Sequence, residues 1–97
     1  MVFLMVSVMM LFDLVRARLS QLPGTHGDAD TWSSMTCGDV SICAYYRPHG
    51  VFFELLTGDD GYIVRSDFRL YCDPEFWGRF DRFCDAYLAA IEGFPLC

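Results

Sequence analysis

Five cysteines are the first side chains with the chemistry for catalysis or metal binding. They are Cys37, Cys43, Cys72, Cys84 and Cys97. No pair has the Cys-x-x-Cys spacing, and the odd number leaves at least one thiol unpaired in a monomer. The spacing also matches no standard zinc site. Reduced thiols, buried as small apolar side chains, are therefore the favoured interpretation.

The segment HGDAD is the second place where ligands could meet. It puts His26, Asp28 and Asp30 at alternate positions, and nitrogen and oxygen ligands of this kind bind divalent cations. Polar segments of this composition are usually solvated turns, so we expect neither a metal nor a cofactor. A catalytic Cys–His pair would require His26 or His49 beside a thiol of lowered pKa, which the spacing does not indicate. The sequence thus predicts no enzyme, and a small metal- or thiol-dependent enzyme remains an alternative.

The charge balance favours a protein partner. The chain has thirteen acidic residues, seven arginines and no lysine, which gives a formal net charge of −6. Binding to a phosphate backbone requires a clustered basic face, whereas these arginines are scattered along the chain. Direct nucleic-acid binding is therefore not expected, and a protein with a basic surface suits this chain better.

The opening segment, MVFLMVSVMMLFDLVRARL, raises the question of a membrane or export signal. A secretory signal begins with positive charge, whereas here the arginines come last. The apolar run of residues 2–12 would give roughly 17 Å of helix against a hydrocarbon core of about 30 Å. From residue 11 on, apolar residues share one side of a helix. We expect a packed helix in a cytoplasmic protein, with a membrane-associated or exported protein that uses residues 1–19 as the alternative.

The rest of the chain predicts a sheet followed by a helix. Between Thr31 and Cys72, period-two alternation indicates three or four strands, and the short turns RPHG and GDDG make an antiparallel meander. From about Pro74 to Glu92, aromatic residues recur at helical spacing. The predicted fold is α+β, one compact domain over residues 1–97: an N-terminal helix, a three- to four-stranded antiparallel meander, and a C-terminal amphipathic helix packed on the sheet.

In the last strand, two sets of side chains alternate. Tyr62, Val64, Phe68 and Leu70 form the apolar set, and Arg65, Asp67 and Arg69 form the charged set. We expect the apolar set to face the C-terminal helix, and Cys72 to lie on the same dry side. The charged set would then lie on the opposite face of the sheet.

The opposite face is the predicted binding surface. It would combine aromatic residues and arginines, which is the composition of interface hot spots. The expected members are Tyr45, Phe52, Leu56, Ile63 and Tyr71, beside Arg47, Arg65 and Arg69. Of these, Tyr45, Arg47, Phe52, Arg65 and Arg69 are the predicted contact residues. Whether the N-terminal helix covers this face stays open at the sequence level. The acidic hairpin tip, Asp59 and Asp60, is a second candidate contact.

These features predict a small acidic protein-binding module that acts by occupying a partner's surface, of the inhibitor, immunity or adaptor type. In size, charge and layout, and in no motif, the chain is similar to small acidic phage-encoded inhibitors, including anti-CRISPR proteins. That similarity implies inhibition of a nucleic-acid-binding complex. A homodimer is a further option for the spare apolar surface.

Overall fold

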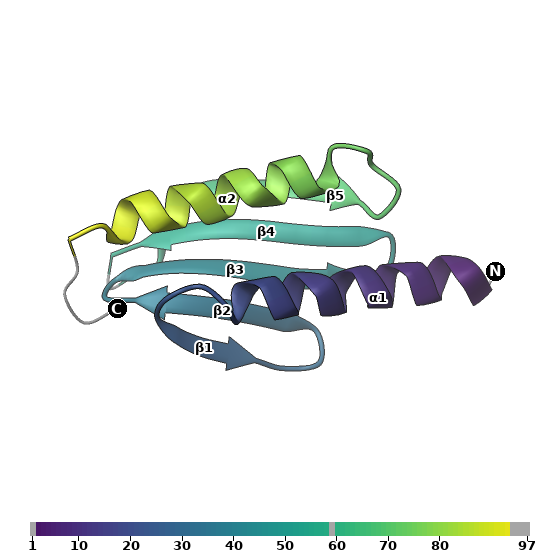
Figure 1. Ribbon diagram of the computed structural model, residues 1–97, viewed down its shortest axis with the longest axis horizontal. Helices are drawn as coiled ribbons and strands as arrows, with labels where there is room; N and C mark the ends of the chain where they lie inside the picture. Colours follow the sequence, from purple (N-terminus) through teal and green to yellow (C-terminus); the bar gives the residue numbers. More distant parts are fainter. Residues whose placement is uncertain (1, 59, 94–97) are drawn as a thin grey trace.

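The computed structural model describes the backbone of residues 2–58 and 60–93, and the side chains from Val8 onward within these ranges (Figure 1). The elements, in order, are α1 (Val2–Leu19), β1 (Thr25–Asp28), β2 (Trp32–Cys37), β3 (Val40–Arg47), β4 (Gly50–Thr57), β5 (Tyr62–Leu70) and α2 (Phe76–Ile91). The strands form one antiparallel sheet in the order β1-β2-β3-β4-β5. The α+β prediction is confirmed, with five strands in place of three or four.

The additional strand is β1, which lies in the segment predicted to be a polar loop. It pairs with β2 in register, with Thr25 opposite Thr36 and Asp28 opposite Ser33. An edge strand of four residues is held by backbone hydrogen bonds and needs no apolar alternation of its own. Its composition therefore resembles that of a loop.

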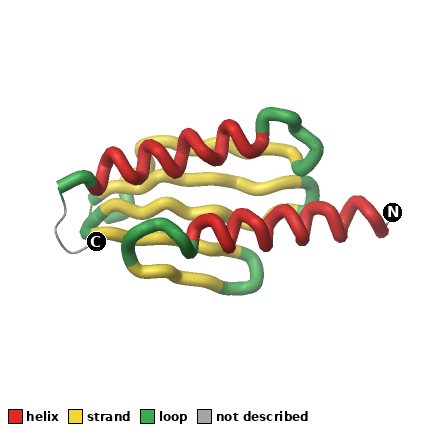
Figure 2. The backbone as a smooth tube through the Cα atoms, viewed as in Figure 1, coloured by secondary structure: helices red, strands yellow, loops and turns green. Residues whose placement is uncertain are grey.

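Both helices lie on the same face of the sheet, as Figures 1 and 2 show. Helix α1 packs over β2 and β3, and α2 packs over β3 and β4. On α1, Phe12, Val15 and Leu19 are buried at the spacing predicted for a packed helix. In the described part of the chain, neither helix is long and apolar enough to cross a membrane.

Aromatic rings fill the core between α2 and the sheet. The ring of Phe53 on β4 packs against those of Phe76, Phe80 and Phe83, with centroids 5.3–5.7 Å apart. All four residues are at most 3% exposed. The predicted burial of the C-terminal aromatic stripe is confirmed, although the helix begins at Phe76 and ends at Ile91.

The prediction that the apolar side of β5 faces α2 was wrong. Arg65 lies opposite Leu55 and Arg69 opposite Val51, so the charged set shares the helix-covered side with the core residues of β4. Phe68 lies opposite Phe52 and Leu70 opposite Gly50, on the other side of the sheet. The cause is a β-bulge between Leu55 and Leu56, which shifts the register by one residue and exchanges the two faces.

Candidate functional site

Four aromatic side chains form a row across the face of the sheet that the described helices leave uncovered. Cross-strand pairing places Trp32 opposite Tyr45, Tyr45 opposite Phe52, and Phe52 opposite Phe68. Residues directly opposite in adjacent strands share a face. Because Phe53 and its cross-strand partner Ala44 belong to the core under α2, their chain neighbours Phe52 and Tyr45 point away from it. We call these four residues the aromatic row.

The ends of the aromatic row are the parts most open to water. Trp32 is 38% and Phe68 40% exposed, while Tyr45 and Phe52 between them are half-buried. The rings of Tyr45 and Phe52 are tilted, with centroids 6.1 Å apart. Leu70, 49% exposed, lies on the same face beside the row. Large apolar side chains left open in this way mark binding sites more often than isolated exposed residues do.

Charged and polar groups border the aromatic row. The Arg47 guanidinium lies 5.6 Å from the centre of the Tyr45 ring, within cation–π distance. In the next row of cross-strand neighbours, Cys43 lies opposite Glu54, and Glu54 lies opposite Ser66. Burial raises the pKa of the Tyr45 phenol, and Cys43 and Glu54 raise it further. Tyr45 is therefore a neutral hydroxyl that can donate a hydrogen bond at neutral pH.

The structure brings together only part of the predicted binding surface. Tyr45, Arg47 and Phe52 share the uncovered face. Arg65 and Arg69 lie on the helix-covered side, so their assignment to one surface with Tyr45 and Phe52 was wrong, for the reason given by the bulge. Asp60 is exposed in the β4–β5 turn, and Asp59 lies outside the described residues.

Trp32 and Phe68 are the members of the row that sequence reasoning missed. Trp32 begins β2, next to the segment that the sequence predicts to be a loop. The sequence predicts Phe68 on the helix side. The signal available for Trp32 was its place in the alternation of residues 32–37, in which Ser33, Met35 and Cys37 are buried.

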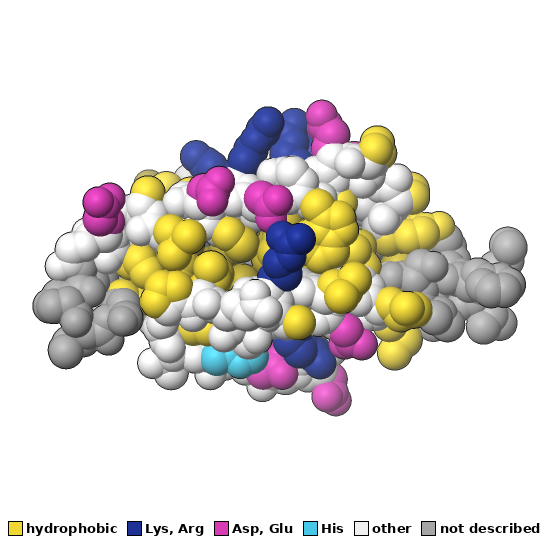
Figure 3. Space-filling model, viewed as in Figure 1, with side chains coloured by type: hydrophobic (Ala, Val, Ile, Leu, Met, Phe, Trp, Pro, Cys, Tyr) yellow, Lys and Arg dark blue, Asp and Glu magenta, His cyan; other side chains and the backbone are white. Residues whose placement is uncertain are grey.

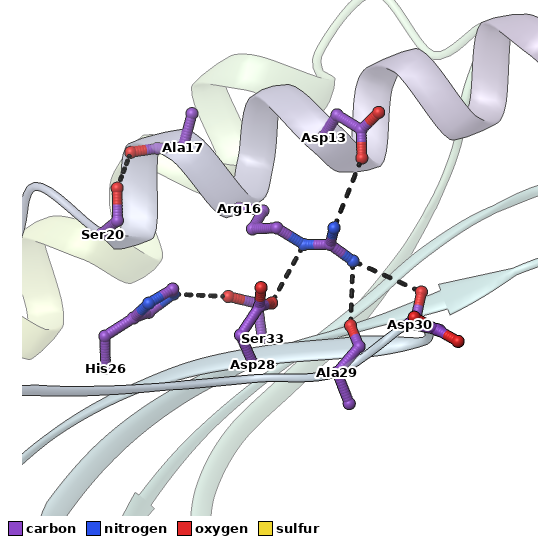
Figure 4. A network of polar contacts seen from close by, with 9 residues as sticks. All are labelled: Asp13, Arg16, Ala17, Ser20, His26, Asp28, Ala29, Asp30 and Ser33. Atoms are coloured by element: carbon purple, nitrogen blue, oxygen red, sulfur yellow. Dashed lines mark hydrogen bonds and ion pairs between the residues drawn. The ribbon is translucent and has the colours of Figure 1, made fainter.

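The HGDAD segment is tied to α1 by Arg16, as Figure 4 shows. Arg16 pairs with Asp28 at 2.9 Å and with Asp13 at 3.6 Å. It also donates to the backbone oxygens of Ala29, at 2.9 Å, and Asp30, at 3.3 Å. These contacts hold the β1–β2 turn against the helix, which is a structural role.

The candidate metal ligands are not brought together. His26 Nε2 lies 3.0 Å from Ser33 Oγ, and the Asp28 carboxylate is paired with Arg16. Within residues 2–58 and 60–93, the structure contains no group of three His, Cys, Asp or Glu side chains placed to hold a metal ion. A cavity of about 390 Å³ adjoins the Arg16 network, and its wall includes Phe12 and Tyr46.

The cysteines differ in state. Cys37 is disulfide-bonded, so the expectation of a reduced thiol was wrong there. Cys43, Cys72 and Cys84 are free. Cys43 is buried and Cys84 half-buried, whereas Cys72 is exposed after β5 and is not on a dry strand face as predicted. Burial raises the pKa of Cys43 and raises that of Cys84 to about 12, so neither is an activated nucleophile.

The arrangement defines a two-layer α+β protein in which the described helices leave one face of the sheet open. Comparison with family models, with curated proteins and with solved structures gives no match. The interpretation of function therefore depends on the surfaces of this chain.

Proposed function

We propose that this protein acts by binding another protein through the uncovered face of its sheet. The observation that carries the proposal is the aromatic row, whose end members Trp32 and Phe68 are exposed on a face without a described helix. Aromatic anchors with an arginine, here Arg47, are typical of interface hot spots. The role would be that of an inhibitor, immunity protein or adaptor, including a phage-type inhibitor such as an anti-CRISPR protein, and it needs no substrate turnover.

The uncovered face has the dimensions of a small specific interface. Five strands give four spacings of about 4.8 Å, and eight residues of about 3.3 Å give the length, so the face measures roughly 19 Å by 26 Å. That footprint, roughly 500 Å² before side-chain relief is added, is at the lower end of specific interfaces. A partner would have to concentrate its contacts on the aromatic row.

Charge favours a different protein over a second copy of this chain. Each copy carries a net charge of −6, so two copies repel each other. Glu54 lies half-buried beside the aromatic row, and a two-fold axis through the face would bring two such carboxylates together. A partner with a basic, partly apolar surface would instead pair with Glu54.

The test uses substitutions at the two exposed ends of the row. Trp32→Thr with Phe68→Thr keeps β-favouring residues in both strands and removes the apolar anchors. Each hot-spot loss weakens binding about thirtyfold or more, since such residues contribute about 2 kcal/mol or more. Affinity purification from the native host, followed by calorimetry with the purified partner, measures the loss.

The matched control is Tyr62→Thr, which removes an aromatic ring that is 70% exposed on the helix side of β5. It should leave binding unchanged. Equal loss in both variants, or full binding by the double variant, contradicts the proposal. A wild-type dimer at neutral pH that the double variant abolishes would show that the face serves self-association.

We also propose the cytoplasm as the location. The free thiols of Cys43, Cys72 and Cys84 support it, and the disulfide at Cys37 stands against it, because disulfides persist mainly in oxidising compartments. Fractionation of host cells tests this proposal, and recovery with membranes or outside the cell contradicts it.

A further inference from the structure

Four of the seven arginines line one groove between β5 and α2. Arg65 and Arg69 come from the strand, and Arg79 and Arg82 come from the helix. The groove has a volume of about 340 Å³, and Ser66, Asp67 and Phe83 complete its wall. Figure 3 shows dark-blue side chains gathered along the edge of the molecule where α2 and β5 lie. We call these four residues the arginine cluster.

The fold creates this cluster from residues that are far apart in the sequence. On β5, the shifted register turns Arg65 and Arg69 toward the helix side. On α2, Arg79 and Arg82 are three residues apart and therefore share one side of the helix. Because α2 lies over β3 and β4, its edge leaves the groove beside β5 open to water.

The acidic groups around the cluster neutralise only part of it. Arg69 pairs with Asp67 at 2.8 Å and with Asp73 at 3.1 Å. Arg79 meets Glu75 at 3.7 Å, and that carboxylate is 67% exposed. Four guanidinium groups thus face three carboxylates in a chain whose net charge is −6. This local excess of positive charge in an otherwise acidic protein favours an anionic ligand.

Two of the arginines have donors to spare. Within the part of the chain that the structure describes, Arg65 and Arg82 form no ion pair. Arg65 Cζ lies 5.9 Å from the centre of the Phe83 ring, and this cation–π contact uses none of the N–H donors of the guanidinium. Arg79 Nε is buried and has no hydrogen-bond partner among the described residues.

The start of α2 borders the arginine cluster. A second cavity of about 160 Å³ lies at this end of the helix and shares Arg79 and Arg82 with the groove. No acidic residue occupies the first turn, and the N-cap residue Glu75 makes no side-chain cap hydrogen bond. Asp73 Oδ1 accepts a hydrogen bond from the Glu75 amide at 2.8 Å, so a carboxylate already lies at the start of the helix. The positive potential of the groove therefore comes from the arginine side chains.

We propose that the arginine cluster binds the phosphate group of a small phosphorylated molecule. Several guanidinium groups around one groove suit an oxyanion with three or more acceptor oxygens, whereas a carboxylate is satisfied by one bidentate arginine. The groove is larger than a phosphate ion and leaves room for a small organic group. Its confinement to one place distinguishes it from the extended basic surface that a nucleic-acid backbone requires.

The experiment is a titration of the whole protein at constant ionic strength, followed by amide chemical shifts and calorimetry. The probes are inorganic phosphate, glycerol 3-phosphate and acetate. We expect saturable one-to-one binding of the phosphates, with shifts centred on β5 and the start of α2. Arg65→Gln with Arg82→Gln should weaken this binding about tenfold or more, since it removes charge-assisted hydrogen bonds. The control Arg47→Gln removes one positive charge from the other face of the sheet, and it should bind the phosphates with wild-type affinity.

Comparison of inorganic phosphate with glycerol 3-phosphate shows whether the groove recognises the phosphate group alone or also the organic group attached to it. Equal affinity for the two phosphates supports recognition of the phosphate group alone, and tighter binding of the ester supports contacts with the rest of the molecule. Acetate binding as well as phosphate, wild-type affinity in the double variant, or no saturable binding overturns the proposal. If the double variant does not fold, Arg82→Gln alone gives the same test, because that side chain is exposed and unpaired in the described structure.

Discussion

At the scale of single residues, the three free cysteines in the described part of the chain differ in access to water. Cys72 is exposed, whereas burial raises the pKa of Cys43 and raises that of Cys84 to about 12. Alkylation requires the thiolate, so these two thiols are mostly unreactive at pH 8. We expect iodoacetamide to label Cys72 first, and Cys84 increasingly as the pH approaches 12. Peptide mass spectrometry measures the order.

Labelling in concentrated urea is the control for this order, because unfolding removes the burial and should make the three rates similar. Labelling of Cys43 or Cys84 in the folded protein as fast as that of Cys72 would contradict the described packing. The same experiment without reductant reports the disulfide at Cys37, because a disulfide-bonded sulfur does not react with iodoacetamide.

At the scale of elements, the β3–β4 hairpin shows what the sequence can predict. The two-residue connection between Arg47 and Gly50 fixes the register of the pair, so Tyr45 must lie opposite Phe52. Alternation along each strand then puts Arg47 on the same face. This part of the binding surface follows from local turn chemistry and a period of two.

The next hairpin shows where such prediction fails. Thr57 lies opposite Tyr62, and a regular ladder continuing from that pair would place Phe68 opposite Val51, on the helix side. The bulge between Leu55 and Leu56 shifts the register, so Phe68 lies opposite Phe52 instead. Long arginines at this margin keep their charged ends in water while their stems cover apolar surface. Neither alternation nor composition reveals the inserted residue.

A hydrogen bond between elements makes a testable contribution to stability. The Tyr87 hydroxyl on α2 donates to the Pro23 backbone oxygen at 2.7 Å and ties α2 to the loop before β1. Tyr87→Phe leaves this carbonyl without its partner and should cost about 1 kcal/mol. The melting temperature should fall by about 4–8 °C in a domain of this size. Urea denaturation measures the cost, and Tyr62→Phe, at a 70% exposed ring, is the control.

The same residue predicts a dependence on pH. Burial raises the pKa of Tyr87 to about 12 in the folded protein, against about 10 in an unfolded chain. The unfolded chain therefore loses this proton first, and stability should fall as the pH rises from 10 to 12. Tyr87→Phe should show a smaller fall over this window. An identical pH profile in both proteins would contradict the burial of this hydroxyl.

At the scale of the whole molecule, the sheet separates two surfaces of different chemistry. Residues 68 and 69 are chain neighbours, yet Phe68 belongs to the aromatic row and Arg69 to the arginine cluster. The arginines are scattered along the sequence. Strand register and helix placement bring four of them together in the fold, and both depend on long-range packing that the sequence pattern does not show. Composition alone could predict an acidic protein, but it could not predict a basic groove on it.

Net charge should keep two copies from associating through the open face, which gives a prediction that requires no partner. The charge is −6 at pH 7 and approaches zero near pH 4.5, the isoelectric point of the sequence. As the pH approaches the isoelectric point, the net charge and the repulsion between copies fall, and the exposed row remains apolar. We expect a monomer at pH 7 and reversible association near pH 4.5 by sedimentation velocity. Trp32→Thr with Phe68→Thr should suppress this association and Tyr62→Thr should not, whereas association that is insensitive to the row would place the apolar contact on another surface.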